Sequence, residues 1–223
     1  MLLTFANVLS PEQLKSVVES LKSEDFVDGR KTAGWHAKLV KNNLQMQSGE
    51  ERTKALQKTC HDAILACSEF HRAYKPKFVR LPMISRYEVG MSYGAHVDDP
   101  FMGSNPIMRT DVATTLFLVD PSTYEGGELV IEGTYGSRSV KLEAGAMVAY
   151  PATTLHRVVP VTSGARVAAV TWAQSMIPDP SHREIIFELD NARRMIFEKD
   201  GKSPAFDLVS KSHANLMRMW SDL

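Results

Sequence analysis

The sequence contains little cysteine, no excess of either charge and no long apolar run. Its two cysteines, Cys60 and Cys67, lie seven residues apart in a helical pattern. This spacing corresponds to about 10.5 Å along a helix axis, too far for a disulfide, so we interpret both as small buried hydrophobic residues. Apolar stretches fall short of the ~20 residues that a membrane span needs, and the first residues lack the basic segment of a secretion signal. We therefore expect a cytoplasmic protein with no membrane association.

The charges of the chain balance, because it contains 26 basic and 26 acidic residues. This balance offers no general attraction for a polyanion, so we expect no nucleic-acid partner. A length of 223 residues with 43% hydrophobic side chains allows one domain with an ample core, with or without helical additions.

Short β-rich segments dominate the middle of the chain, and Gly, Pro, Asp and Ser bound them. We predict strands at residues 78–89, 93–97, 110–119, 128–132, 138–142, 146–150, 155–159 and 166–173. Many short strands without intervening helices indicate a sandwich or barrel of jelly-roll character.

Helical patterns flank this β-rich block on both sides. Ser10, Pro11 and Gln13 predict a capped helix that runs to about residue 22. A second helix is predicted from Ser48 to about residue 73, and residues 35–46 between the two helices look extended. Two further helices are expected at residues 179–198 and 204–223.

These patterns divide the chain into three parts. Residues 1–76 form an N-terminal helical and strand region that packs on the core, residues 77–176 form the β-core, and residues 177–223 form a C-terminal helical extension. The extension is an accessory unit that could form a homo-oligomer contact.

A candidate metal site begins with His96 and Asp98 at the end of a predicted strand. Side chains alternate faces along a strand, so residues two apart project to the same side, and this parity selects Asp98 over Asp99. A third ligand must come from elsewhere, and His156 is the best candidate. Two histidines and one carboxylate on one face of a metal form the facial triad of non-haem Fe(II) oxygenases.

Ten residues after His156, Arg166 opens another predicted strand. Ala168, Val170 and Trp172 share its strand face, so the guanidinium would enter an otherwise apolar interior, where a bound carboxylate would be a suitable partner. From spacing alone, a surface arginine that follows a hairpin turn at residues 163–164 is an equal alternative.

The order H-x-D, distant His and following Arg is typical of Fe(II)/2-oxoglutarate dioxygenases. Over nearly its whole length the chain resembles the bacterial PKHD-type hydroxylases, relatives of the prolyl and lysyl hydroxylases. The resemblance includes residues 41–43, 109–111, 125–129 and 187–191.

This resemblance implies an α+β fold with a double-stranded β-helix (jelly-roll) core, N-terminal flanking helices and a C-terminal helical extension. It also implies Fe(II) held by His96, Asp98 and His156, and 2-oxoglutarate as cosubstrate, held by Arg166 and by Tyr87 on the preceding strand. The implied reaction uses O₂ and couples oxidative decarboxylation of 2-oxoglutarate, to succinate and CO₂, with hydroxylation of an unidentified acceptor. Ascorbate (vitamin C) is the implied reductant.

The acceptor site is less well defined by the sequence. Weaker candidates for contact with the acceptor are Lys41, Asn42, Asn43, Arg86, Tyr93 and Arg109. Taken singly, each is also explained as a surface, structural or core residue. The loop at residues 99–108 has the composition of a possible lid, and the glycines of residues 125–128 indicate a tight turn.

Two other functions compete with the oxygenase. Two histidines and an aspartate could hold zinc with an open water position, as in a metallohydrolase. However, the sequence has no H-E-x-x-H motif to supply a general base, and Arg166 would have no role. A non-catalytic jelly-roll module that senses a metal or a small molecule is the second alternative, although all three ligands are present.

Overall fold

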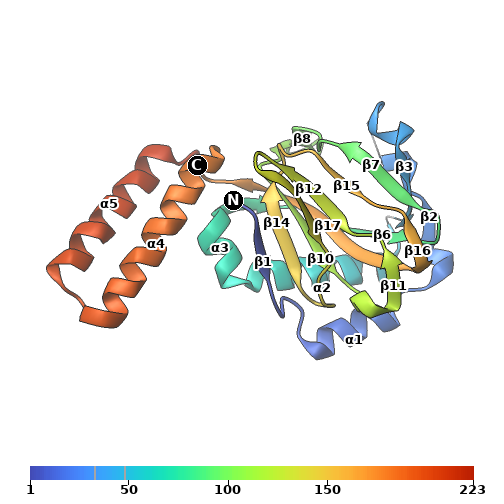
Figure 1. Ribbon diagram of the computed structural model, residues 1–223, viewed down its shortest axis with the longest axis horizontal. Helices are drawn as coiled ribbons and strands as arrows, with labels where there is room; N and C mark the ends of the chain where they lie inside the picture. The colour runs from blue at the N-terminus through green and yellow to red at the C-terminus, as the bar shows by residue number, and fades with distance from the viewer. Residues whose placement is uncertain (33, 48) are drawn as a thin grey trace.

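Two antiparallel sheets form the centre of the protein in the computed structural model, which describes residues 1–32, 34–47 and 49–223 (Figure 1). The larger sheet has the strand order β1 (Leu3–Phe5), β14 (Met147–Pro151), β10 (Val112–Phe117), β17 (Arg166–Ser175), β6 (Met83–Tyr87), β4 (Leu44–Met46) and β2 (Phe26–Asp28), and β5 (Pro76–Val79) also pairs with β17. The smaller sheet has the order β13 (Gly136–Val140), β12 (Leu129–Gly133), β15 (His156–Val158), β7 (Ser92–His96) and β3 (Lys41–Asn42).

Strand β10 shows how the larger sheet separates two cores. Every residue of this strand is buried, so both of its faces are covered. Val112 and Leu116 belong to an apolar cluster that includes helix residues, whereas Ala113 and Phe117 belong to a second cluster with residues of the smaller sheet. The larger sheet therefore packs against helices on one face and encloses the space between the sheets on the other.

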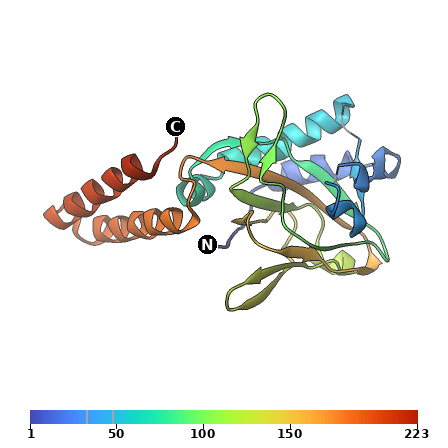
Figure 2. The same cartoon turned by 90° about the horizontal axis from the view of Figure 1, so that it is seen from above.

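Three helices from the first third of the chain supply the helical core, α1 (Pro11–Glu19), α2 (Glu51–Ala66) and α3 (Ser68–Tyr74). Figure 2 shows α1 and α2 along one side of the strands. Ser10 and Gln13 form the predicted capping box. The prediction of one helix to residue 73 is wrong, because Cys67 has extended φ and ψ angles of −72° and 99° and separates α2 from α3. The predicted start at Ser48 lies outside the described residues, and Glu50 is the N-cap of α2.

Several short elements differ from the predicted pattern. The predicted strand at residues 78–89 is two strands, β5 and β6, and the segment at residues 35–46 contains a 3₁₀ turn before β3. Several short strands were not predicted, among them β2, β8 (Phe101–Met102), β9 (Met108–Arg109), β11 (Tyr124–Gly126) and β16 (Val161–Gly164). The 3₁₀ turns are η1 (Ser23–Asp25), η2 (Gly29–Thr32), η3 (Ala37–Leu39) and η4 (Pro121–Thr123).

The C-terminal helices α4 (Pro180–Asp200) and α5 (Pro204–Trp220) form an antiparallel hairpin that projects from the β-core (Figure 1). The hairpin is anchored at Asp190, whose side chain receives hydrogen bonds from Arg72 of α3 and from Arg193 and Arg194 of its own helix. Within the described ranges, no helix is long and apolar enough to cross a membrane. The division at residues 76 and 176 stays a prediction; β1, β3 and β4 of the first part pair with β14, β7 and β6 of the second.

Candidate active site

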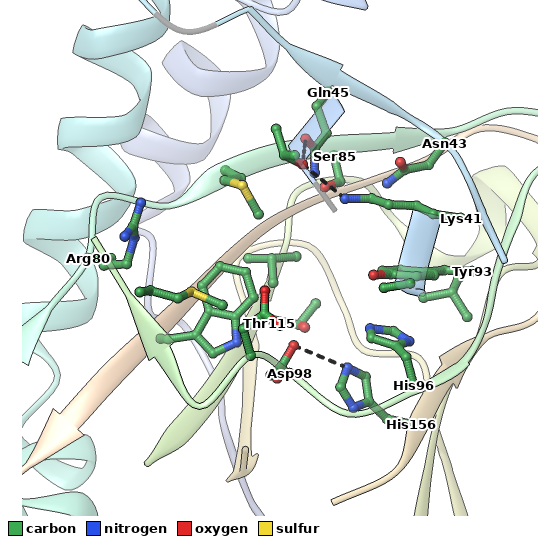
Figure 3. A pocket seen from close by; sticks show the side chains of 18 of the residues that line it. Lys41, Asn43, Gln45, Arg80, Ser85, Tyr93, His96, Asp98, Thr115 and His156 are labelled. Carbon is green, nitrogen blue, oxygen red and sulfur yellow. Dashed lines mark hydrogen bonds and ion pairs between the residues drawn. The ribbon is translucent and has the colours of Figure 1, made fainter. Parts of the chain in front are cut away.

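His96, Asp98 and His156 meet in a cavity of about 570 Å³ between the two sheets (Figure 3). His96 ends β7 and His156 begins β15, and these strands pair with the two histidines in register. The imidazole rings are therefore neighbours, with centroids 4.2 Å apart. Asp98 follows β7, and its Oδ1 atom lies 3.8 Å from His156 Nε2. One ligand atom from each of the three residues lies within 4.8 Å of the other two, a separation suited to one metal ion.

Backbone carbonyl groups orient both imidazoles. His96 Nδ1 donates to the carbonyl of Gly94 at 2.8 Å, and His156 Nδ1 donates to the carbonyl of Thr154 at 3.0 Å. A carbonyl oxygen can only accept, so each contact places the ring proton on Nδ1. Nε2 of each ring is then the unprotonated nitrogen that a metal requires.

Burial sets the charge state of the ligands. It lowers the pKa of His96 to about 3, with repulsion from His156 acting in the same direction, so His96 is neutral near pH 7. Burial raises the pKa of Asp98, while the nearby His156 opposes this rise. Within the described chain, Asp98 Oδ2 is buried without a partner at full hydrogen-bond geometry, although the Trp172 side chain lies close enough to act against the rise in the pKa of the carboxyl. A divalent cation would satisfy this oxygen and offset the cost of burying the carboxylate.

Arg166 lies in the same cavity and is 1% exposed. Its position at the start of β17 pairs it with Tyr87 of β6, and its guanidinium carbon lies 5.2 Å from the centre of the Tyr87 ring. Neither Nε nor Nη1 has a hydrogen-bond partner among residues 1–32, 34–47 and 49–223. The surface alternative is therefore wrong, and a buried guanidinium with unpaired donors is available for an anion.

The glycine turn supports this position of Arg166. Gly126 and Gly127 have the positive φ angles that the predicted tight turn requires, 71° and 68°. A Cβ atom on Gly127 would lie 3.1 Å from Arg166 Cδ and 3.0 Å from Val161 Cγ2. The second glycine therefore also provides space for the arginine side chain, a role that the sequence pattern did not predict.

Two tyrosines line the cavity at different depths. Tyr87 is 4% exposed, and burial raises the pKa of its hydroxyl although Arg166 opposes the rise. Tyr93 stacks on His96 with ring centroids 3.6 Å apart and an interplanar angle of 17°. Tyr87 thus lies beside Arg166, whereas Tyr93 forms the wall next to the three candidate metal ligands.

A family model described as the 2OG-Fe(II) oxygenase superfamily matches residues 82–174, which include the triad and Arg166. A PKHD-type hydroxylase of Gloeothece citriformis is 51% identical over 222 residues, with 100% of both chains covered. The chain belongs to the 2OG-Fe(II) oxygenase superfamily. A PKHD-type hydroxylase of Rippkaea orientalis is 48% identical over 220 residues, with 99% of both chains covered.

Solved structures of this superfamily share the fold. The crystal structure of a Pseudomonas putida prolyl-4-hydroxylase has a TM-score of 0.55 and 17% identity, and the match covers 78% of this chain and 92% of that one. A prolyl hydroxylase from Trichoplax adhaerens has a TM-score of 0.58 and 16% identity, with coverage of 78% and 83%. The predicted jelly-roll class is confirmed, and the close relatives confirm the predicted reaction class, a 2-oxoglutarate-dependent hydroxylase.

The weaker candidates fall into two groups. Lys41 and Asn43 are buried and line the cavity beside Tyr93 (Figure 3). Asn42 is exposed, Arg86 pairs with Glu88, and Arg109 pairs with Asp111 and Asp222. Asp99 and the β8–β9 segment border the cavity, and a lid function for this segment stays a prediction. Further polar residues that the sequence did not indicate also line the cavity, namely Thr32, Gln45, Gln57, Arg80, Ser85 and Thr115.

Proposed function

We propose that His96, Asp98 and His156 hold Fe(II), and that Arg166 binds the distal carboxylate of 2-oxoglutarate with Tyr87 beside it. The observation that carries this proposal is the presence of two buried, unpaired groups of opposite charge in one cavity, Asp98 Oδ2 and the Arg166 guanidinium. Each lacks a partner in the described chain, and iron and the cosubstrate would supply one for each. Binding of Fe(II) and 2-oxoglutarate would thus offset the free-energy cost of burying both the Asp98 carboxylate and the Arg166 guanidinium.

The side chains around this site orient the cosubstrate and exclude water. Two N–H groups of Arg166 match the two oxygens of a carboxylate, so they would fix one end of 2-oxoglutarate. Val170 and Trp172 lie further along the same strand face and give the cavity an apolar wall. When bound, iron and 2-oxoglutarate would allow O₂ to act as the oxidant, with one oxygen atom used to convert 2-oxoglutarate to succinate and CO₂ and the other to hydroxylate the acceptor.

Several further points belong to the same proposal. Ascorbate would keep the iron reduced, as the resemblance implies. The balanced charge of the chain supports the absence of a nucleic-acid partner, and a cytoplasmic location stays a prediction. A homo-oligomer through α4 and α5 is supported by exposed apolar side chains on both helices, such as Met195, Leu208 and Met219.

The test is formation of succinate from 2-oxoglutarate in air, followed by NMR without an added acceptor. We expect slow succinate formation that requires Fe(II), increases with ascorbate and is lost when zinc replaces iron. Tight retention of zinc with no succinate under any of these conditions would contradict the proposal and favour the hydrolase or the sensor.

A further inference from the structure

One wall of the cavity is polar where a β-sheet protein normally places apolar side chains. Lys41, Asn43, Gln45 and Ser85 all line the cavity, and each is at most 5% exposed. We call these four residues the polar wall (Figure 3). Between Lys41 and Gln45 the alternation is inverted, because the polar residues point inward while Asn42 is exposed and Leu44 is half-buried. Buried polar groups are costly unless they are paired, so this inversion needs a reason.

Lys41 carries a positive charge that its surroundings do not neutralise. The described residues accept one hydrogen bond from its ammonium group, at Thr32 Oγ1 and 3.1 Å. The Thr32 hydroxyl that accepts this bond carries no charge, and it donates in turn to Gln45 Oε1. The carboxylates that act on Lys41 from a distance are Asp28, which is paired with Arg30, and Asp98, which would be a metal ligand. Two of the three N–H donors of Lys41 are thus available to a ligand.

Asn43 provides a second sign of a missing ligand. Its side chain is 3% exposed, and within the described ranges neither Oδ1 nor Nδ2 has a partner at full hydrogen-bond geometry, although the amide lies close enough to the Tyr87 hydroxyl to act against the rise in its pKa. The nearby backbone accommodates this side chain closely, because a Cβ atom on Gly29 would lie only 2.1 Å from Asn43 Oδ1. The chain therefore holds an unsatisfied amide in the same cavity as an ammonium group that has a single hydrogen-bond partner among the described residues.

The polar wall lies close to the metal ligands. The Lys41 ammonium nitrogen is 5.2 Å from the centre of the Tyr93 ring, whose plane stacks on His96. A group bound at Lys41 is thus separated from a metal ligand by a single aromatic ring. Arg166, the other buried cation of the cavity, is already assigned to the distal carboxylate of 2-oxoglutarate.

We propose that the polar wall binds a carboxylate of the acceptor, and that this carboxylate lies a few bonds from the carbon that is hydroxylated. This inference rests on the proposed function, because it assigns Arg166 to 2-oxoglutarate and leaves Lys41 for a second anion. Lys41 contributes the charge, and Asn43 contributes an amide donor. The carboxylate could belong to a small organic acid or to an acidic side chain of a polypeptide.

The experiment uses the full chain loaded with Fe(II) and saturating 2-oxoglutarate without oxygen. Calorimetry then measures the binding of two pairs of probes, N-acetyl-β-alanine with its amide, and acetyl-Gly-Asp-Gly-amide with its Asn counterpart. We expect at least one acid to bind saturably and its neutral partner to bind about tenfold or more weakly. Binding of the free acid alone indicates a small acceptor, whereas binding of the acidic peptide alone indicates a polypeptide.

Four variants assign the effect to Lys41. Lys41→Met should weaken binding of the acid about tenfold or more, and Lys41→Arg should restore part of it. Lys38→Met changes an exposed lysine of the same segment, and Arg80→Met changes a third cationic side chain that lines the cavity besides Lys41 and Arg166. Neither control should alter binding of the acid.

Four results would overturn the inference. The first is equal binding of the acids and their neutral partners, and the second is undiminished binding of the acid to Lys41→Met. The third is loss of acid binding in Arg80→Met but not in Lys41→Met. The fourth is weaker binding of 2-oxoglutarate to Lys41→Met. The last result would place Lys41 in the cosubstrate site. The visible band of the Fe(II)–2-oxoglutarate complex separates this failure from failure of the proposed function, because the band forms before any probe is added.

Discussion

Arg166 in the cavity and Asp190 in the C-terminal hairpin are both 1% exposed, yet their surroundings differ completely. Asp190 receives three arginines, with its oxygens 2.7 Å from Arg72 Nε, 2.6 Å from Arg193 Nη2 and 3.1 Å from Arg194 Nε. Arg166 has no such partner among the described residues. A buried charge that its own chain saturates contributes to structure, whereas one that its chain leaves unpaired indicates a ligand. We therefore expect substitutions at the two sites to have opposite effects on stability and activity.

The largest effect is expected from Asp98→Ala, because it removes one of the three proposed metal ligands from the cavity. Loss of a residue that merely supports a ligand costs roughly 10–100-fold in metal affinity, and loss of the ligand itself should cost more. Succinate formation should fall below detection, while the thermal unfolding midpoint falls little. The neighbouring Asp99→Ala variant is the matched control and should retain succinate formation. Normal iron binding by Asp98→Ala would refute the assignment.

Arg166→Met should weaken the binding of 2-oxoglutarate without lowering the stability of the protein. Two charge-assisted hydrogen bonds to a carboxylate are lost, so the dissociation constant of 2-oxoglutarate should rise roughly 100-fold or more. Unfolding of the ligand-free protein should require the same free energy or more, because an unpaired buried guanidinium is replaced by an apolar side chain. Calorimetry and chemical unfolding measure the two quantities, with Arg86→Met as the control. A marked loss of stability would mean that Arg166 is a structural residue.

Asp190→Asn should have the reverse effect. Loss of the charge-assisted bonds should lower the stability of the hairpin by ~2–3 kcal/mol, as its partner arginines are left without an anion. Hydrogen exchange across residues 180–220 should increase, whereas binding of 2-oxoglutarate should stay unchanged. Asp200→Asn, at the exposed end of α4, is the matched control. Unchanged exchange in Asp190→Asn would show that the ion pairs do not anchor the hairpin.

The smallest effect concerns pH. Burial alone would raise the pKa of Asp190, but hydrogen bonds from Arg72, Arg193 and Arg194 outweigh it and lower the pKa well below its ordinary value. A lowered pKa in the folded state stabilises the protein fully above the ordinary value of about 4, and this contribution is lost as the pH falls further. The difference in unfolding free energy between wild type and Asp190→Asn should therefore shrink from pH 7 to pH 3. A difference that does not change with pH would contradict the conclusion that the ionised Asp190 carboxylate is stabilised by the three arginines.

The sequence predicted His96 and Asp98 because their relation is local, whereas His156 was selected from the order of an H-x-D motif, a distant His and a following Arg. Strand parity selected Asp98 over Asp99, and the inward face of residues 166–172 followed from the same alternation. The sequence also contains the inverted alternation between Lys41 and Gln45. Considering each residue by itself does not reveal this pattern and leaves Gln45 out. The role of Gly127 beside Arg166 was not readable, because it depends on a contact between distant parts of the chain.

The helical and long-range features were harder to predict. The break at Cys67 interrupts a periodic apolar stripe, so the pattern alone favoured one helix. The ion pair between Arg72 and Asp190 joins residues 118 positions apart, and no local pattern indicates that pairing. The two-residue strands β8 and β9 are too short to show any alternation.

The most direct test is the visible spectrum of the protein with Fe(II) and 2-oxoglutarate in the absence of oxygen. A charge-transfer band should appear only when both are present, because it requires the cosubstrate to chelate the iron. The band should be lost in Asp98→Ala, require far more 2-oxoglutarate in Arg166→Met, and form normally in Asp190→Asn. A wild-type protein that gives no band, or a band that Arg166→Met leaves unchanged, would contradict the conclusion that the unpaired charges of the cavity mark the iron and 2-oxoglutarate site.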